Sequence, residues 1–190
     1  MNDSARKNLY ALLSRLFSKE LDSEAVTELK AQNDLLENIG EASAKWFADT
    51  PEKTLIDALN VDFTSLFLLY APPIEAAIRD NSKEIPVGLE NPVMQFYRRH
   101  GFGINMNQTH LNAPDHLSIE LGFMEALIGN GENEAEQAFL ADHLLMWAPS
   151  YLLAQSEAAD TPFYRDLCEF ATEFLLADYQ HLSEAAGAAL

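Results

Sequence analysis

The densest group of polar residues lies between residues 114 and 120, where the sequence is PDHLSIE. If Pro114 is the first residue of a helix, Asp115 and His116 lie in its first turn, where the carboxylate of Asp115 could face a bound cation. His116 and Glu120 are four residues apart and share one helix face, so they could hydrogen-bond or hold a metal ion. The structural alternative is that Asp115 only complements the helix dipole and that the His–Glu pair is a tether.

Most signatures of catalytic and cofactor sites are absent from the sequence. There is no G-x-x-x-x-G-K-[ST], no G-x-S-x-G and no H-E-x-x-H motif. No glutamate is followed by a histidine three residues later, which argues against a di-iron carboxylate site. The competing enzymatic hypothesis is a small metal-dependent hydrolase or nucleotide-binding enzyme that uses Asp115, His116, Glu120 and His143. These spacings fit no standard set of metal ligands, so the motif support for this hypothesis is thin and we predict no metal site.

Two further residues with reactive side chains are expected in the core. His143 and Trp147 are four residues apart on a predicted helix with an apolar stripe, which favours a buried structural histidine. Cys168, the one cysteine, lies in the middle of another predicted helix without a basic neighbour, which favours an inert thiol.

Composition limits the class of partner. The chain has 190 residues, with 30 acidic residues against 12 Lys and Arg, and a formal net charge of −18. Such a charge argues against nucleic acid or an anionic membrane as partner and leaves room for a cationic one. Residues 101–190 contain 14 acidic residues and one basic residue, giving −13, whereas residues 1–100 contain 16 and 11, giving −5. The acidity is therefore concentrated in the half that contains Asp115 and His116.

The sequence also predicts the compartment. A single cysteine excludes an intrachain disulfide and is typical of a reducing environment. The first 20 residues contain charged residues among their leucines and no unbroken apolar region, so we expect no secretory signal. No stretch approaches 18 apolar residues. We expect a soluble cytoplasmic protein without a membrane-spanning segment.

Composition and periodicity both predict helices. The chain has 28 Leu and 26 Ala but only 4 Val and 8 Ile, which favours helices over strands. Apolar residues recur at three- and four-residue spacing, and Thr50-Pro51, Asn91-Pro92 and Thr161-Pro162 are typical helix starts. Pro114 and Pro149 are expected to open helices in the same way. Helices are expected near residues 4–18, 23–38, 41–48, 51–70, 92–100, 114–129, 133–147, 149–157 and 162–182. The prediction is one all-α domain over residues 1–190, a compact bundle of about eight to nine helices.

Two connections, residues 71–90 and 101–113, are long for a compact helical domain, which favours a functional role over a plain linker. Just before the first of them, Phe63, Leu66 and Phe67 could line a groove. An aromatic stripe at helical spacing is, however, more typical of core.

Taken in order, these segments resemble the TorD/DmsD/NarJ family of redox-enzyme maturation chaperones. Residues 114–124 are similar to the family pattern P-D-H-L-x-x-E-L-x-F-M, which is quite specific. The weaker supporting segments are Asp62-Phe63-Thr64-Ser65-Leu66-Phe67, Pro72-Pro73-x-Glu75, Phe96-Tyr97-Arg98-x-x-Gly101-Phe102 and His143-Leu144-x-x-Trp147-x-Pro149. The resemblance covers about residues 60–170. It departs from the pattern after Glu75, where this chain has Ala76-Ala77-Ile78.

The resemblance implies a non-enzymatic all-helical chaperone with no catalytic residue, and we expect no cofactor. Such a protein binds the twin-arginine signal peptide and the apo form of a molybdoenzyme precursor, assists insertion of the molybdopterin cofactor and delays export until maturation. The signal-peptide-binding residues expected here are Asp115, His116, Pro114, Leu117, Glu120, Phe63, Leu66, Phe67, Pro72, Pro73 and Glu75. The client enzyme is not identified, and both a monomer and a helix-exchanged dimer stay open. A generic acidic adaptor for a basic partner is a third hypothesis.

Overall fold

The structure, a computed structural model, describes residues 1–79, 88–104, 111 and 113–188. The described part is almost entirely helical and contains no β-strand, which confirms the all-α prediction. The predicted connections at 71–90 and 101–113 lie partly outside the described residues. Within the described ranges, no helix is both long enough and apolar enough to cross a membrane.

The chain is divided into two compact units. Unit 1 consists of Met1–Ser18, Pro73–Pro149 and Phe174–Leu190, and unit 2 consists of Lys19–Pro72 and Ser150–Glu173. The single domain expected over residues 1–190 stays a prediction.

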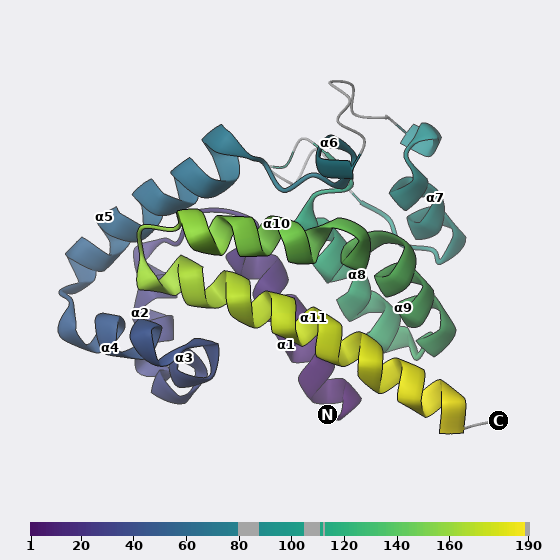
Figure 1. Cartoon of the computed structure of the whole chain (residues 1–190), viewed down its shortest axis with the longest axis horizontal. Coiled ribbons are helices and arrows are strands. Elements are labelled where there is room, and N and C mark those ends of the chain that lie inside the picture. Colours follow the sequence, from purple (N-terminus) through teal and green to yellow (C-terminus); the bar gives the residue numbers. More distant parts are fainter. Residues whose placement is uncertain (80–87, 105–110, 112, 189–190) are drawn as a thin grey trace. The chain divides into compact units, whose positions relative to one another are not determined.

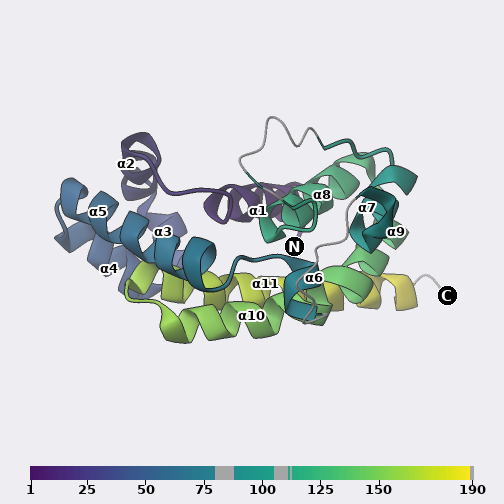
Figure 2. The same cartoon turned by 90° about the horizontal axis from the view of Figure 1, so that it is seen from above.

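Unit 1 is assembled from segments that are far apart in sequence. Its helices are α1 (Asp3–Leu16), α6 (Glu75–Arg79), a 3₁₀ turn (Gly88–Glu90), α7 (Pro92–Arg99), α8 (Leu117–Asn130), α9 (Asn133–Phe139), a π-helical segment (Leu140–Leu144), the start of α10 (Leu145–Ala158) and the second half of α11 (Pro162–Ala188). Most residues of α8 up to Ile128 are buried, so this helix forms the centre of the unit. Figures 1 and 2 show α1 alongside α8, and the hydroxyl of Ser14 donates to the carbonyl of Ser118 at 2.6 Å.

Unit 2 contains the helices drawn in dark blue and blue in Figure 1 together with the parts of α10 and α11 that meet at their connecting loop. Its other elements are α2 (Ser23–Ala31), α3 (Asn33–Ile39), α4 (Glu41–Asp49), α5 (Glu52–Phe63) and a π-helical segment (Thr64–Tyr70). The start of α11 is held by Asp62, whose carboxylate accepts hydrogen bonds from the backbone and hydroxyl of Thr161 at 2.8 and 2.6 Å.

The helix boundaries follow the predicted pattern with informative exceptions. Asn91 and Thr161 precede proline-started helices as expected, and the side chain of Asn91 accepts from Val93 N at 2.9 Å. The predicted helix at 23–38 is instead two helices that meet at Gln32. Pro149 does not open a helix, because α10 already begins at Leu145, directly after a π-helical segment. A proline one turn inside a helix lacks only the hydrogen bond to the first carbonyl of that helix.

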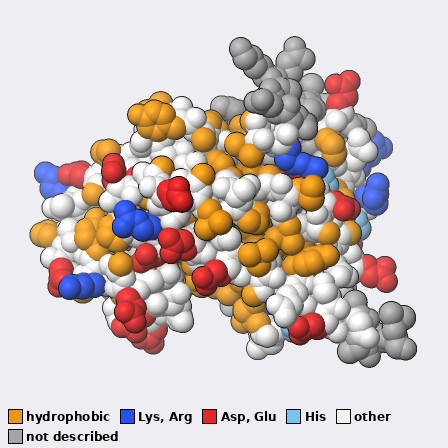
Figure 3. All heavy atoms as spheres, in the orientation of Figure 1, with side chains coloured by type: hydrophobic (Ala, Val, Ile, Leu, Met, Phe, Trp, Pro, Cys, Tyr) orange, Lys and Arg blue, Asp and Glu red, His pale blue; other side chains and the backbone are white. Residues whose placement is uncertain are grey.

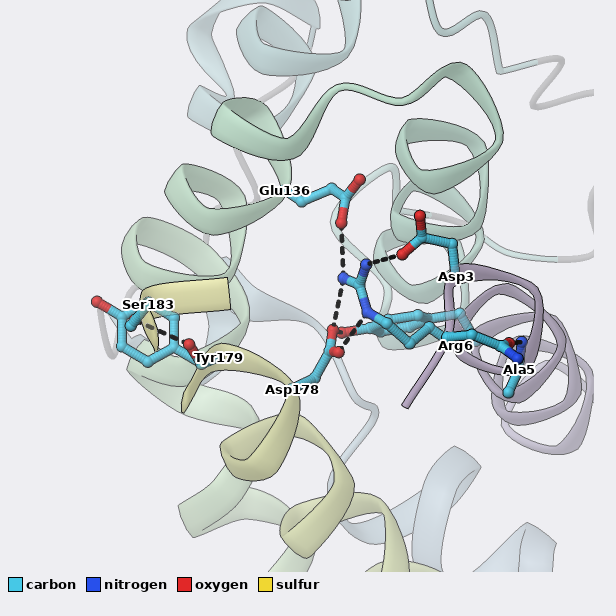
Figure 4. A network of polar contacts seen from close by, with 9 residues as sticks. Asp3, Ala5, Arg6, Glu136, Asp178, Tyr179 and Ser183 are labelled. Carbon is cyan, nitrogen blue, oxygen red and sulfur yellow. Dashed lines mark hydrogen bonds and ion pairs between the residues drawn. The ribbon is translucent and has the colours of Figure 1, made fainter. Parts of the chain in front are cut away.

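A buried ionic network joins three helices of unit 1 (Figure 4). Arg6 of α1 donates through Nε and Nη2 to both oxygens of Asp178 on α11, at 2.5 and 3.0 Å. The same Nη2 donates to Glu136 of α9 at 2.6 Å. All three side chains are buried, and only Asp3, the fourth member, lies at the surface. Burial lowers the pKa of Arg6, but the hydrogen bonds and charges of the two buried carboxylates outweigh it and raise the pKa.

Candidate functional site

Two segments of the expected site are joined by their backbones in unit 1. Glu75 N donates to the carbonyl of Asp115 and Leu117 N donates to the carbonyl of Pro73, both at 2.9 Å. Ile74 and His116 thereby form an isolated antiparallel bridge. This bridge brings the Pro72-Pro73-x-Glu75 segment against residues 114–117, so it fixes the position of Glu75 relative to Asp115.

The bridge also changes where the next helix starts. The expectation that Pro114 opens it and that Asp115 and His116 lie in its first turn is wrong, because α8 begins at Leu117. Residues that pair in a bridge need extended backbone, and His116 has φ −78° and ψ 137°. His116 is instead the N-cap, and its Nδ1 accepts from Ser118 N at 3.2 Å.

The carboxylate of Asp115 is buried, with 1% of the residue exposed. Its Oδ2 accepts from Ala76 N at 2.9 Å, and the Asn91 side chain also lies near the carboxylate. Oδ1 accepts no hydrogen bond within the described residues. Burial raises the pKa of Asp115 despite these hydrogen-bond donors. A buried acceptor without a partner is costly, so Asp115 has a lone pair available for a donor that enters from outside.

Glu75 is the second buried carboxylate, and His143 and Arg79 both lie beside it. Its Oε2 lies 3.0 Å from Nδ1 of His143, and its Oε1 accepts from Nη1 of Arg79. Burial alone would raise the pKa of Glu75, but the hydrogen bond and charge of His143, followed by those of Arg79, outweigh it and lower the pKa. Glu75 is therefore held in its ionised form.

His143 is buried, as the apolar stripe predicted, but it is also part of the site. It stacks on Phe139 with ring centroids 4.9 Å apart and pairs with Glu75. The pairing was missed because His143 lies in the π-helical segment Leu140–Leu144, whereas the sequence argument assumed an uninterrupted α-helix. Short π-helical segments occur frequently at functional sites, but the apolar pattern around this histidine reads as a continuous helix and gave no signal of one.

Glu120 lies close to Glu75 but has a different character. It is fully buried, and its Oε2 accepts from Nε1 of Trp147 at 3.3 Å. Burial, and next the charge of Glu75, raise the pKa of Glu120 well above its ordinary value, which favours the protonated form. The expected His116–Glu120 contact across one helix face is not what holds these residues, since His116 is bound to Ser118. Among the described residues, no three His, Cys, Asp or Glu side chains are placed to hold a metal ion.

A cavity of about 280 Å³ opens over the two buried carboxylates. Its lining residues all belong to unit 1 and are Glu75, Ala76, Arg79, Asn91, Pro92, Val93, Asp115, Asp142 and His143. The cavity combines an ionised carboxylate, a buried carboxyl oxygen without a partner and an exposed aspartate, so it is suited to a cationic hydrogen-bond donor.

The apolar residues expected at the site lie in the core of unit 2. Phe63, Leu66 and Phe67 are all buried, as periodicity favoured. Phe63 and Phe67 pack on Tyr164 with ring centroids 5.9 and 5.6 Å apart. The π-helical segment Thr64–Tyr70 that carries two of them ends in three consecutive exposed apolar residues: Leu68, Leu69 and Tyr70. Of the two prolines that follow, Pro72 is exposed and Pro73 is buried.

Replacement of His116 by asparagine is expected to flatten the dependence of stability on acidic pH. Burial lowers the pKa of His116 from about 6.5 to about 4. Between these values the unfolded chain binds a proton that the folded chain does not, so stability falls as the pH falls from 6.5 to 4. The loss amounts to roughly 3 kcal/mol. Asparagine is a good N-cap and does not titrate.

The measurement is urea unfolding of both proteins at several pH values between 4 and 7. The comparison isolates His116, because every other titrating group is common to both chains. His181→Gln, which changes an exposed histidine, serves as the control and should keep the slope of the unchanged protein. Equal slopes for His116→Asn and the unchanged protein would show that His116 titrates alike in the folded and unfolded chains.

Comparison with known proteins gives consistent matches. The family model described as nitrate reductase delta subunit matches residues 18–152. A chaperone protein TorD from Psychrobacter sp. (strain PRwf-1) is 26% identical over 212 residues, covering 98% of this chain and 95% of the relative. One from Vibrio vulnificus (strain YJ016) is 28% identical, covering 93% and 94%. One from Aggregatibacter aphrophilus (strain NJ8700) is 31% identical over 128 residues, where the match spans 64% of this chain and 59% of the relative.

Proposed function

Because the chain belongs to the nitrate reductase delta subunit family, as its motifs predicted, we propose that it is a chaperone for the maturation of a redox enzyme. In this proposal it binds the twin-arginine signal peptide and the apo form of a molybdoenzyme precursor. It assists insertion of the molybdopterin cofactor and delays export until the enzyme is mature. The relatives that match almost the whole chain carry the name of a chaperone, which is not an enzymatic class.

The observation that carries the proposal is the cavity over Glu75 and Asp115. An arginine side chain presents several N–H donors in a fixed plane, and carboxylates accept them in pairs. The ionised Glu75 and the free oxygen of Asp115 supply such acceptors at one cavity. We assign the signal-peptide arginines to this cavity.

The remaining residues expected at the site have supporting roles in this proposal. Pro73 and Leu117 make one of the two hydrogen bonds of the backbone bridge, Pro114 accepts from the hydroxyl of Tyr97 at 3.3 Å, and His116 caps α8. Pro72 continues the bridged segment at the surface. Glu120 accepts a hydrogen bond from Trp147 and lies next to Glu75. Its raised pKa favours the protonated form, so Glu120 is not an anionic partner for a bound cation. These residues position Glu75 and Asp115 and need not touch the peptide.

Charge alone does not account for useful affinity. An exposed ion pair contributes about 0–1 kcal/mol, whereas micromolar binding needs about 8 kcal/mol. A fully buried Leu or Phe side chain contributes roughly 1.5–3 kcal/mol, so the apolar segment of the peptide must supply most of the affinity. Acidic side chains are spread over the face shown in Figure 3, where they would attract a basic peptide without selecting it.

The apolar segment is assigned to the end of the π-helical segment in unit 2. Leu68, Leu69 and Tyr70 are exposed there, and adjacent exposed apolar side chains are typical of an interaction surface. In this assignment Phe63, Leu66 and Phe67 do not contact the peptide. They are buried in the core of unit 2 and anchor the π-helical segment Thr64–Tyr70. The two assignments are independent, one in each unit, and each has its own test.

Replacement of Asp115 by asparagine is expected to weaken binding of the cognate twin-arginine peptide about tenfold. A hydrogen bond to a charged group contributes about 1.5–3 kcal/mol, and asparagine keeps an acceptor for Ala76 N while removing the charge. Isothermal titration calorimetry with the synthetic peptide measures the change, and circular dichroism checks that helicity is kept. The same peptide with both arginines changed to lysine should bind less tightly.

Glu134→Gln is the matched control, because it removes one exposed carboxylate of unit 1 outside the cavity. It should leave the affinity within a factor of two. If Asp115→Asn and Glu134→Gln bind the peptide equally well, Asp115 does not belong to the binding site. If neither the unchanged chain nor any variant binds the peptide, the proposed function itself is wrong.

A further inference from the structure

Arg79 places a guanidinium of the chain itself in the cavity over Glu75 and Asp115. It is the last residue of α6 and lines the cavity. Its Nη1 donates to Oε1 of Glu75 and, at 3.1 Å, to the carbonyl of Asp142. The cavity therefore already holds the kind of group that the proposed function brings to it from outside.

In the described part of the chain, the protein uses only part of the hydrogen-bonding capacity of the Arg79 guanidinium. Within the described residues, only Nη1 of its guanidinium donates to the protein, and 34% of the side chain is exposed. Ion pairs between helix residues four apart contribute little, and exposure weakens them further. Meanwhile Oδ1 of Asp115, which is buried and lines the same cavity, accepts nothing from Arg79. A guanidinium that entered from outside could thus gain an acceptor that Arg79 does not use.

The position of Arg79 in the chain accounts for this difference. Glu75 and Arg79 are four residues apart on one short helix, so the arginine approaches the carboxylate along α6. Asp115 accepts from the backbone of the same helix at Ala76. Arg79 is tethered to the side of Glu75 that faces Asp142, whereas a guanidinium of a peptide has no such tether.

We propose that Arg79 is an internal occupant of the cavity, which a guanidinium of the bound partner displaces. The inference rests on the proposed function and adds a competition to it. In the free chain, Arg79 occupies the ionised carboxylate of Glu75. A cation that lacks the planar set of N–H donors of a guanidinium competes poorly with Arg79 for this carboxylate. Removal of Arg79 should therefore increase affinity for arginine, whereas removal of an arginine elsewhere on unit 1 should not.

The probe for this competition is N-acetyl-arginine amide, compared with N-acetyl-lysine amide, and binding is followed by NMR chemical-shift titration. We expect Arg79→Ala to bind the arginine amide about twofold more tightly than the unchanged chain, as loss of a weak competing ion pair predicts. The lysine amide should gain less. Glu75→Gln in the Arg79→Ala background should abolish the gain, because it removes the shared acceptor.

Arg98→Ala is the matched control. It removes the same charge from an exposed position on α7 that does not line the cavity. Equal affinity in Arg79→Ala and the unchanged chain would overturn the inference, and so would an equal gain in Arg98→Ala, which would indicate bulk electrostatics. Far-UV circular dichroism establishes that each variant is folded.

The same variants titrated with the twin-arginine peptide separate the inference from the proposed function. If the peptide binds the unchanged chain and Arg79→Ala leaves its affinity unaltered, the competition is wrong and the proposed function stands. If the arginine amide shows the gain but no variant binds the peptide, the cavity accepts a guanidinium and the signal peptide is not its source.

Discussion

Replacement of Arg6 by methionine is expected to lower the free energy of unfolding by about 3–5 kcal/mol. Asp178 and Glu136 both face Arg6 in the interior of unit 1, and the substitution leaves these two carboxylates buried without their cation. Burial raises the pKa of Glu136 even with Arg6 present. Without the charge of Arg6 this pKa would rise further, which favours the protonated carboxyl. Methionine keeps much of the arginine stem's volume, which limits the loss of packing. Urea unfolding at pH 7 measures the change.

Two controls separate the charge from the packing. Tyr10→Phe removes only the hydroxyl that donates to Asp178 at 2.8 Å, and it should cost about 1 kcal/mol. Adding Asp178→Asn and Glu136→Gln to Arg6→Met should recover part of the loss, because no buried charge then remains unpaired. A loss below 1 kcal/mol for Arg6→Met alone would mean that the network contributes little to stability.

This network illustrates what the sequence does not reveal. Arg6 and Asp178 are 172 residues apart, and neither lies in a motif. Periodicity identifies the buried face of each helix, but it does not say which helices meet. Local signals were more successful: the Leu- and Ala-rich composition predicted an all-α chain, and Asn91-Pro92 and Thr161-Pro162 predicted helix starts correctly.

The candidate site was predictable only in part, and for a similar reason. The family resemblance singled out both Glu75 and Asp115, and the comparisons support that family. The geometry that joins them is a one-residue bridge between Ile74 and His116, which is too short to leave an alternating pattern in the sequence. Proline and aspartate at 114 and 115 therefore resembled an ordinary helix start. Backbone pairing with residues 73–75 keeps His116 extended instead, so α8 begins only at Leu117.

The interrupted helices account for the other differences. The sequence predicts uninterrupted helices at 51–70 and 133–147, whereas each contains a π-helical segment. A π-helical hydrogen bond joins residues five apart, whereas an α-helical one joins residues four apart, so the residues that follow a π turn face a different direction from an α-helical continuation. His143 consequently pairs with Glu75, and Leu68, Leu69 and Tyr70 come to be exposed after a buried aromatic pair.

Replacement of Phe67 by alanine is expected to destabilise unit 2 by about 3–5 kcal/mol, because truncation of a fully buried aromatic residue removes its contacts and leaves a cavity. Phe67 packs against Phe63 at 5.1 Å and against Tyr164 at 5.6 Å between ring centroids. Thermal and urea unfolding measure this loss. Affinity for the signal peptide, measured where the variant is still folded, should fall as well, because the displaced segment carries Leu68, Leu69 and Tyr70.

Leu69→Ala distinguishes contact with the peptide from support of the fold. Leu69 is 71% exposed, so its truncation should change the free energy of unfolding by less than about 0.5 kcal/mol. If the apolar segment of the peptide lies on Leu69, however, affinity should fall by about tenfold or more, which corresponds to the burial of one aliphatic side chain. Loss of affinity in Phe67→Ala at unchanged stability, together with full affinity in Leu69→Ala, would contradict this assignment. It would place the buried aromatic residues themselves at the peptide and require unit 2 to open on binding.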